Sequence, residues 1–230
     1  MVTTVGLILA AGSGNRFQGS GLKQFQRLGE RPVISHSLDR FEAASVLESY
    51  RVVGPPGELE RTRSIGSLDD REKCVGLLEG GATRRASVRR GLAAFSGEGA
   101  DRVVVHDAAR PLVPSNLLAE LSRTLTDAGC AGVIPVLPIA DTVKRIDADG
   151  RVLSTLRRNE LRRAQTPQLF RFPVLQSVHE EWPEDRAVTD DASMLEARDH
   201  SVLTTEGSPL LRKITYRSDL ETLEWMLGKE

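Results

Sequence analysis

An apolar segment that runs straight into a glycine-rich loop constrains the fold of this chain more than any other feature. Residues 4–10 (TVGLILA) are almost all apolar, which is typical of a central strand buried on both faces of a sheet. The loop that follows contains Gly12, Gly14, Gly19 and Gly21 together with Arg16 and Lys23. Glycines let backbone N–H groups converge on a ligand, and the two cations add fixed positive charge. The segment therefore predicts a phosphate site at the end of the first strand.

Strand-like and helix-like segments alternate after this loop. Further apolar runs predict strands at 49–53, 74–78, 102–106 and 131–137. Apolar residues at helical spacing predict helices over 23–28, 33–44 and 84–95, and another that ends near residue 128. This alternation is typical of the α/β class. We expect a Rossmann-like, doubly wound and mostly parallel sheet that binds its ligands beyond the carboxyl ends of the strands.

The pattern changes after residue 138. Two alternating stretches within 141–156 flank Asp149 and Gly150, which is a β-hairpin signal. A hairpin inserted into a parallel sheet has to project from it, and a two-stranded ribbon is marginally stable alone. We therefore expect a β-arm at about residues 138–160 that packs on a partner. Beyond the arm, we expect helices over 173–182, 190–198 and 218–227, and short strands at 202–206 and 211–215. No linker interrupts the chain, which predicts one domain over residues 1–230.

Composition excludes several classes of function. Lys and Arg total 31 against 32 Asp and Glu, so no bulk charge favours nucleic acid or an anionic membrane. The first apolar segment is too short to span a bilayer, and no basic stretch precedes it as in a secretory signal. Cys74 and Cys130 have apolar neighbours and are expected to be buried thiols. We expect a cytoplasmic protein that binds neither nucleic acid nor membranes.

Polar residues at the strand ends are the candidates for chemistry. Asp107 follows the strand at 102–106 and could hold Mg²⁺ between its carboxylate and substrate phosphates, or could simply cap the next turn. His106 is expected to be a core histidine. The arginines at 84, 85, 89 and 90 predict a solvated helix face, although the glycines before them suggest backbone contact with a nucleotide. Those at 157, 158, 162 and 163 are either surface or a site for an anionic substrate.

The spacing of these residues excludes familiar nucleotide sites. The position three after Gly14 is Phe17, so the dinucleotide fingerprint is absent, and Lys23 lacks the Ser or Thr that follows it in a P-loop. A nicotinamide dehydrogenase is also disfavoured because no acidic residue ends the second strand. The chain has no Ser-His-Asp spacing, histidine cluster or paired cysteines, which argues against hydrolase and zinc chemistry. The glycine loop, the strand-end carboxylate and the scattered cations suit an enzyme that catalyses a transfer at phosphorus by positioning its substrates and neutralising their charge.

Seven short motifs follow one another along the chain. They are LAAGSGNR from Leu9 with Lys23-Gln24, GGATRRAS from Gly80, VHDAARP from Val105, Asp141-Thr142, Thr166-Pro167-Gln168, TDDAS from Thr189, and Lys213-Ile214-Thr215. In this order they resemble the 2-C-methyl-D-erythritol 4-phosphate cytidylyltransferases of the non-mevalonate isoprenoid pathway over essentially the whole length. The resemblance implies that CTP reacts with a polyol phosphate, methylerythritol phosphate, in the presence of Mg²⁺ or another divalent cation. The products would be CDP-methylerythritol and pyrophosphate.

The resemblance also implies roles for individual residues. The triphosphate would be wrapped by Ala10, Ala11, Gly12, Gly14, Arg16 and Lys23, and the catalytic cations would be Arg16, Lys23 and Lys213. Gly81 and Ser87 would contact cytosine, and Asp107 and Ala108 the ribose side, with Asp107 as the metal ligand. A homodimer that exchanges arms would bring Arg110, Thr142 and Arg158 from the neighbour to the substrate phosphate, with Thr166 and Thr189 nearby.

Two residues depart from the pattern of the family, and two alternative functions are also considered. Leu22 occupies a position where the family usually has proline, and Ala82 one where an acidic residue often follows the paired glycines. A cytidylyltransferase of the same fold that takes ribitol 5-phosphate would look alike in its nucleotide half and differ in the arm and near Thr189. A non-catalytic nucleotide-binding regulator would keep the glycine loop without the charges of residues such as Lys23 and Asp107.

Overall fold

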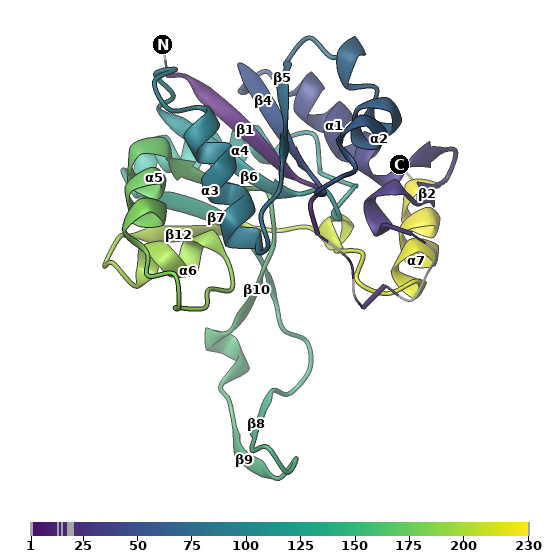
Figure 1. The fold of residues 1–230 in the computed structure, drawn as a ribbon. Helices are drawn as coiled ribbons and strands as arrows, with labels where there is room; N and C mark the ends of the chain where they lie inside the picture. Colours follow the sequence, from purple (N-terminus) through teal and green to yellow (C-terminus); the bar gives the residue numbers. More distant parts are fainter. Residues whose placement is uncertain (1, 13, 15, 18–20, 230) are drawn as a thin grey trace.

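A mostly parallel β-sheet forms the centre of the protein, which we describe from a computed structural model for residues 2–12, 14, 16–17 and 21–229 (Figure 1). Its parallel strands are β1 (Thr4–Leu9), β4 (Ser49–Gly54), β5 (Cys74–Glu79), β6 (Arg102–Asp107) and β7 (Gly132–Pro138). Over the described residues the strand order is β10-β7-β11-β6-β1-β4-β5, with β12 also paired to β7. All six residues of β1 are buried, as expected for a central strand covered on both sides.

Helices cover both faces of this sheet, which confirms the doubly wound α/β prediction. They are α1 (Val33–Ala43), α2 (Leu59–Gly66), α3 (Arg84–Ala94), α4 (Leu117–Ala128), α5 (Phe172–Glu181) and α6 (Asp191–Glu196), whereas α7 (Ser218–Leu227) packs in a third cluster with Leu28 and Ile214. Ile8 of β1 packs in one core cluster with α1 and α4, whereas its neighbour Leu7 packs in a second cluster with α3 and α5. Successive strand residues point to opposite faces, so β1 contributes to both cores. Among the described residues, no helix combines the length and apolarity needed to cross a membrane.

An antiparallel segment, absent from the sequence-based prediction, separates β6 from β7. Strands β10 (Arg162–Ala164) and β11 (Gln168–Arg171) both pair antiparallel with β7, and β11 also pairs with β6. Between them, the Gln165 backbone N–H donates to the Pro135 carbonyl at 2.9 Å, so the two form one interrupted strand. The parallel strand β12 (Val202–Glu206) lies on the other edge of β7. After the arm, the chain therefore returns to the sheet, where β11 lies between β6 and β7.

Two short predicted elements are wrong. The stretch 23–28 forms a 3₁₀ turn (Lys23–Phe25) and then a small hairpin of β2 (Arg27–Leu28) and β3 (Arg31–Pro32), not a helix. Gly29, with a φ of 59°, makes the reversal between these strands. The stretch 211–215 is not a strand, since a 3₁₀ turn (Pro209–Leu211) leads into irregular chain. Both stretches owe their apolar pattern to burial of single side chains, such as Leu28, Leu211 and Ile214, rather than to a regular element.

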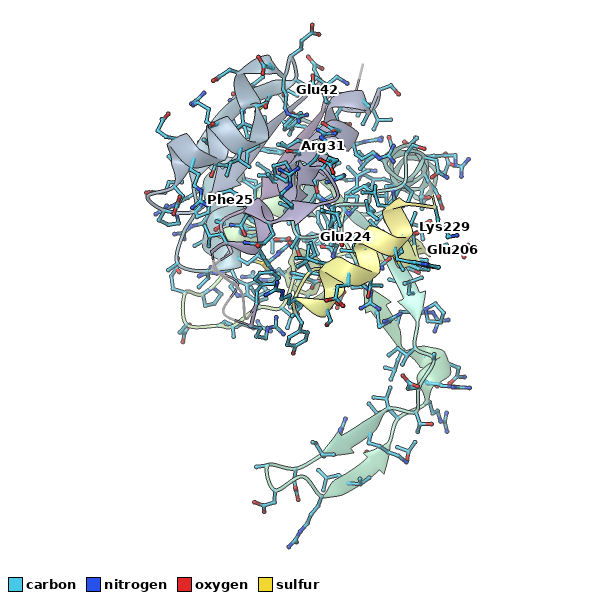
Figure 2. The ribbon with its side chains drawn as sticks, turned by 90° about the vertical axis from the view of Figure 1, so that its right-hand side faces the viewer. Phe25, Arg31, Glu42, Glu206, Glu224 and Lys229 are labelled. Carbon is cyan, nitrogen blue, oxygen red and sulfur yellow. The ribbon has the colours of Figure 1, made fainter. Side chains whose placement is uncertain are left out.

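The predicted hairpin is confirmed and stands away from the body of the protein in both views (Figures 1 and 2). Strands β8 (Lys144–Ile146) and β9 (Val152–Thr155) pair antiparallel and belong to a separate two-stranded sheet. Three apolar side chains on this arm are more than half exposed: Ile146 at 57%, Val152 at 62% and Leu153 at 59%. A ribbon that exposes so much apolar surface lacks a core of its own.

Candidate active site

Two cavities meet at the carboxyl ends of the parallel strands. The first has a volume of about 420 Å³ and lies among the ends of β1 and β6 and the loop after β5. The second, of about 710 Å³, lies beside β7, β10 and the start of α6. Arg84, Asp107 and Lys213 line both cavities. Ligands in the two cavities would therefore approach one another at these three side chains.

Asp107 is the central charge of this junction because it ends β6 between two cations. Its Oδ2 lies 2.5 Å from Lys213 Nζ, and its Oδ1 lies 3.2 Å from Arg84 Nε. Burial by itself would raise the pKa of this carboxyl, but the charges of Arg84 and Lys213 outweigh it and hold the pKa well below its ordinary value. Asp107 is therefore ionised throughout the neutral pH range and fixes both cations at the cavity walls.

Lys23 adds a cation with no carboxylate within ion-pair distance in the described part of the chain. Its Nζ donates to the Ile214 carbonyl at 2.8 Å, which places it next to Lys213. Burial, followed by the charge of Lys213, lowers the pKa of Lys23 to about 8 despite the attraction of Asp107. Beside it, Gln24 Nε2 donates to the Ala10 carbonyl at 2.6 Å and so ties this turn to the end of β1. A partly buried cation of this kind calls for an anionic ligand.

Gly81, the second of the paired glycines before α3, lies in the opposite wall of the first cavity. A Cβ on Gly80 would lie 2.2 Å from the Cβ of Ala11, and one on Gly81 would lie 2.4 Å from the Cβ of Ala86. These contacts are impossible, so both positions require glycine. The Thr83 hydroxyl accepts from the Ala86 backbone N–H at 3.1 Å and caps α3. The helix therefore begins at the cavity wall, where its N-terminus favours a bound anion.

Arg84 is a site residue that the sequence-based prediction missed. The prediction of a solvated arginine face is wrong for it, because its guanidinium lies between Asp107 and Asp191, with Nη1 2.7 Å from Asp191 Oδ2. Burial disfavours the charged guanidinium, but the two carboxylates outweigh this and raise its pKa. Its place in the first turn of a helix that starts at a strand end was the signal available in the sequence.

The other arginines of α3 also have fixed partners. Arg85 and Arg89 both pair with Glu184, and Arg90 Nη1 donates to the Gly80 carbonyl at 2.7 Å. These contacts attach the loop after α5 and the paired glycines to α3. Arg85 is buried, so the predicted solvated face is wrong for it as well, but Arg89 and Arg90 are exposed as predicted.

Thr166 lines the second cavity and is held in place by Asp107 and His106. The Thr166 Oγ1 accepts from the Asp107 backbone N–H at 3.0 Å and lies 3.1 Å from His106 Nδ1. His106 Nε2 lies 3.1 Å from the Arg110 carbonyl, so this nitrogen carries the hydrogen and Nδ1 accepts from the threonine hydroxyl. Burial lowers the pKa of His106 to about 3, so the ring is neutral. The prediction of a core histidine is confirmed.

The structure brings most of the predicted site residues to these two cavities. The first is lined by Ala10, Ala11, Gly12, Lys23, Gly81, Ser87, Asp107, Ala108 and Lys213. The second is lined by Arg110, Thr166 and Thr189 as well as by Asp107 and Lys213. Arg110 thus lies at the cavity of its own chain, whereas the resemblance implied that a neighbour supplies it. Unpredicted residues at the same walls include Gln24, Arg84, Gln165 and Gln168.

Four predicted residues lie outside both cavity linings. Gly14 rests against the Lys23 side chain, and Arg16 is exposed but close enough for its charge to lower the Lys23 pKa. Thr142 and Arg158 are exposed at the base of the arm, where Arg158 donates to the Ala140 carbonyl. Gly19, expected in the phosphate loop, falls outside the described residues.

The donor set suits a divalent cation that arrives with phosphates rather than a permanently bound one. In the described ranges, no group of three or more His, Cys, Asp or Glu side chains could hold a metal ion. Asp107 nevertheless presents a carboxylate that lines both cavities. Mg²⁺ commonly binds through one or two carboxylates together with substrate phosphates and water. The residues present fit that mode, in which Asp107 would be the protein ligand.

Comparison with known proteins identifies the family. The sequence model described as "IspD: 2-C-methyl-D-erythritol 4-phosphate cytidylyltransferase" matches residues 4–229. The chain belongs to this family. A 2-C-methyl-D-erythritol 4-phosphate cytidylyltransferase of Cereibacter sphaeroides (strain KD131 / KCTC 12085) is 38% identical over 227 residues, 99% of this chain and 98% of that relative. Membership of the IspD family confirms the resemblance seen in the motifs and the nucleotidyltransferase class.

Solved structures of IspD proteins share the whole fold. The 4-diphosphocytidyl-2C-methyl-D-erythritol synthase of Anaerococcus prevotii DSM 20548 matches with a TM-score of 0.85 at 26% identity, covering 99% of each chain. The 2-C-methyl-D-erythritol 4-phosphate cytidylyltransferase of Thermus thermophilus matches with a TM-score of 0.77 at 30% identity, covering 96% of this chain and 98% of the other. The predicted Rossmann-like architecture with its projecting hairpin is therefore that of the IspD family.

Proposed function

We propose that this chain transfers the cytidylyl group of CTP to 2-C-methyl-D-erythritol 4-phosphate and releases pyrophosphate. The observation that carries this proposal is the junction of the two cavities at Arg84, Asp107 and Lys213. CTP in the first cavity and the phosphate of the acceptor in the second would meet there. The geometry supports a reaction between two anionic ligands across a shared set of cations.

In this reaction a phosphate oxygen of the acceptor attacks the α-phosphorus of CTP. A new P–O bond forms while the bond from the α-phosphorus to the oxygen shared with the β-phosphorus breaks, and the electron pair leaves with pyrophosphate. The attacking phosphate is ionised at neutral pH, so the step requires no general base. The protein supplies alignment and positive charge, chiefly from Lys23, Lys213 and Arg16. A divalent cation held by Asp107 would add charge neutralisation on the phosphates.

The nucleotide would be selected by the opposite wall of the first cavity. Gly81 and Ser87 are the proposed contacts of cytosine, with Ala108 and Asp107 on the ribose side, and Gly12 near the phosphates. Ser87 is held in place because its hydroxyl donates to the Thr83 carbonyl at 3.1 Å and accepts from the Gly81 backbone N–H at 3.1 Å. Such a wall of backbone and small side chains suits a flat base.

A pyrophosphate-release assay with CTP and Mg²⁺ tests the proposed function. We expect release with methylerythritol phosphate to exceed that with ribitol 5-phosphate by at least about tenfold in kcat/KM, because the second cavity has to fit one polyol. A reversed preference would favour the ribitol phosphate alternative. No release with either acceptor from well-folded protein would refute the proposal and leave the regulator alternative.

The same proposal includes a homodimer in which the arms are exchanged. The exposed Ile146, Val152 and Leu153 support a partner for the arm. Thr142 and Arg158 lie outside the cavities of their own chain, and an exchanged arm would deliver them to the second cavity of the neighbour. There they would contact the acceptor phosphate with Thr166, Thr189 and Arg110.

Charging the apolar arm should separate the subunits. We expect the triple variant Ile146→Asp, Val152→Asp, Leu153→Asp to be monomeric in analytical ultracentrifugation and to lose more than about tenfold in turnover, since buried apolar area drives association. Arg151→Asp is the matched control, because this exposed residue shares the hairpin and contacts Asp147 through its backbone alone, where its N–H donates to Asp147 Oδ1 and its carbonyl accepts from the Asp147 N–H. A monomeric parent protein, or a triple variant that stays dimeric, would contradict the proposed exchange.

The lowered pKa of Lys23 predicts a pH dependence. Above about pH 8 the amine loses its proton and its attraction for the triphosphate. We therefore expect kcat/KM for CTP to fall as pH rises through about 8, and Lys23→Arg to move that fall to higher pH because guanidinium stays charged. Initial rates between about pH 6.5 and 9.5 measure both profiles across this range. Coincident profiles for the two proteins would show that Lys23 does not control binding.

We also propose the compartment and the binding partners of the enzyme. Cys74 and Cys130 are free thiols, which suits a reducing compartment, and we place the enzyme in the cytoplasm. The net charge of -1 gives no general attraction for nucleic acid. The partners we propose are therefore CTP, the polyol phosphate, a divalent cation and a second copy of the chain.

A further inference from the structure

A buried histidine–aspartate pair lies behind the junction of the cavities and lines neither of them. His179 on α5 and Asp191 at the start of α6 each have 1% side-chain exposure, and His179 Nε2 lies 2.9 Å from Asp191 Oδ1. The carboxylate can only accept, so Nε2 carries the hydrogen. His179 Nδ1 is buried without a hydrogen-bond partner among the described residues. The His179 ring therefore makes one hydrogen bond among the described residues, from Nε2–H to Asp191 Oδ1.

This hydrogen bond is the far end of a chain of polar contacts that leads to the cavities. The second oxygen of Asp191 accepts from Arg84 Nη1 at 2.7 Å, and Arg84 Nε reaches Asp107 at 3.2 Å. Asp107 then holds Lys213 at 2.5 Å. Arg84 is therefore placed by two carboxylates, one on each side, and the orientation of Asp191 decides where its guanidinium lies.

We propose that His179 is a positioning residue for cytidylyl transfer, which holds Asp191 so that Arg84 stays against Asp107 at the junction. This inference rests on the proposed function. The His179 N–H occupies one oxygen of Asp191 and leaves the other for Arg84. Without it, both oxygens would be free to take the fork of the guanidinium in a bidentate pair. That arrangement would draw Arg84 away from Asp107 and out of the shared wall.

Replacing His179 should move the side chains of Asp191 and Arg84 but leave the backbone at the start of α6 in place. The neighbouring Asp190 is fixed independently, since its Oδ1 accepts from the Ser193 backbone N–H at 3.1 Å and its Oδ2 accepts from Gln168 Nε2 at 3.1 Å. The start of α6 therefore keeps its place when His179 changes. What changes is the rotation of the Asp191 carboxylate and, through it, the position of Arg84.

Three variants of histidine residues test the role. We expect His179→Leu to lower kcat by about 10- to 100-fold with a change in KM for CTP below about threefold, because misplacement of a charge acts mainly on the transition state. His179→Gln, which keeps an N–H donor, should recover most of the lost kcat. The control His200→Leu alters an exposed histidine and should leave both constants unchanged. Wild-type kcat in His179→Leu, or no recovery in His179→Gln, would overturn the proposal.

A double-mutant cycle with Arg84→Lys separates positioning from general support of the fold. Lysine keeps the charge but lacks the planar guanidinium whose Nε and Nη1 reach Asp107 and Asp191 separately, so His179→Leu should lower kcat less than about twofold further in that background. Losses that multiply would show a role independent of Arg84 and overturn the proposal. If thermal melts show that His179→Leu is unfolded, His179→Phe, which keeps a ring at this position without an N–H donor, replaces it in the cycle with the same expectation. Absence of pyrophosphate release by the parent protein would instead refute the proposed function itself.

Discussion

Lys23→Ala is expected to lower kcat/KM for CTP by about 100- to 1,000-fold, the range typical for loss of a preorganised charge at a reacting centre. Lys23 lines the first cavity beside Lys213 and has no carboxylate within ion-pair distance among the described residues, so its charge is directed to the ligand. Its folded-state pKa of about 8 lies below the ordinary value of 10.5. Burying the cation therefore opposes folding below about pH 8, and alanine should not lower the melting temperature.

Steady-state kinetics and thermal melts of two further variants complete this test. Arg16→Ala should have a smaller effect in the same direction, because Arg16 is exposed and acts on the site at longer range. Lys229→Ala is the control, since this exposed lysine lies over the ring of Trp225, away from both cavities. Figure 2 shows Lys229 near the end of α7. Unchanged turnover in a well-folded Lys23→Ala protein would remove Lys23 from the proposed triphosphate site.

Asp107→Asn is expected to lower kcat/KM by at least about 100-fold and to raise the Mg²⁺ concentration that gives half-maximal rate. The substitution keeps the shape of the side chain but removes the negative charge that holds Arg84 and Lys213. The amide is also a poorer ligand for a hard cation. Mg²⁺ titrations of initial rate, compared between the two proteins, measure both effects.

The same substitution should reduce stability near neutral pH. The pKa of Asp107 is held below its ordinary 3.8, so its ionised form stabilises the folded protein above about pH 4, and this contribution is lost as pH falls towards the folded-state pKa. The asparagine variant lacks this contribution, so the difference in melting temperature should narrow in acid. Asp69→Asn, at an exposed ion pair with Arg63, is the control. An unshifted Mg²⁺ dependence in Asp107→Asn would contradict the proposed metal ligand.

Local sequence was enough to predict the parallel core. The apolar run of β1, its glycine loop and the strand that delivers Asp107 each have a strong local signal, because strands buried on both faces are continuously apolar. Parallel strands place their carboxyl ends at one edge, so the loops and Asp107 could be expected to meet. The hairpin signal around Asp149 and Gly150 was equally local.

The antiparallel part of the sheet had no such signal. Strand β10 reads Arg-Arg-Ala and is exposed, and its pairing depends on β7, which lies well before it in the chain, on the other side of the arm. Conversely, the apolar pattern of 211–215 arises from single buried side chains in an irregular segment. Edge pairing and isolated burial are set by long-range contacts, which hydrophobic periodicity does not record.

The sequence by itself determined the strand-loop-helix opening, the glycine-lined wall and the strand-end carboxylate, because each depends on residues that are adjacent along the chain. Only the tertiary structure decided which charges act together. It moved Arg84 from an expected solvated face to a position between Asp107 and Asp191, set Lys23 beside Lys213, and placed Arg110 at the cavity of its own chain. Those partners are far apart in sequence, and burial and charge pairing across α3, α6 and the segment after β12 bring them together.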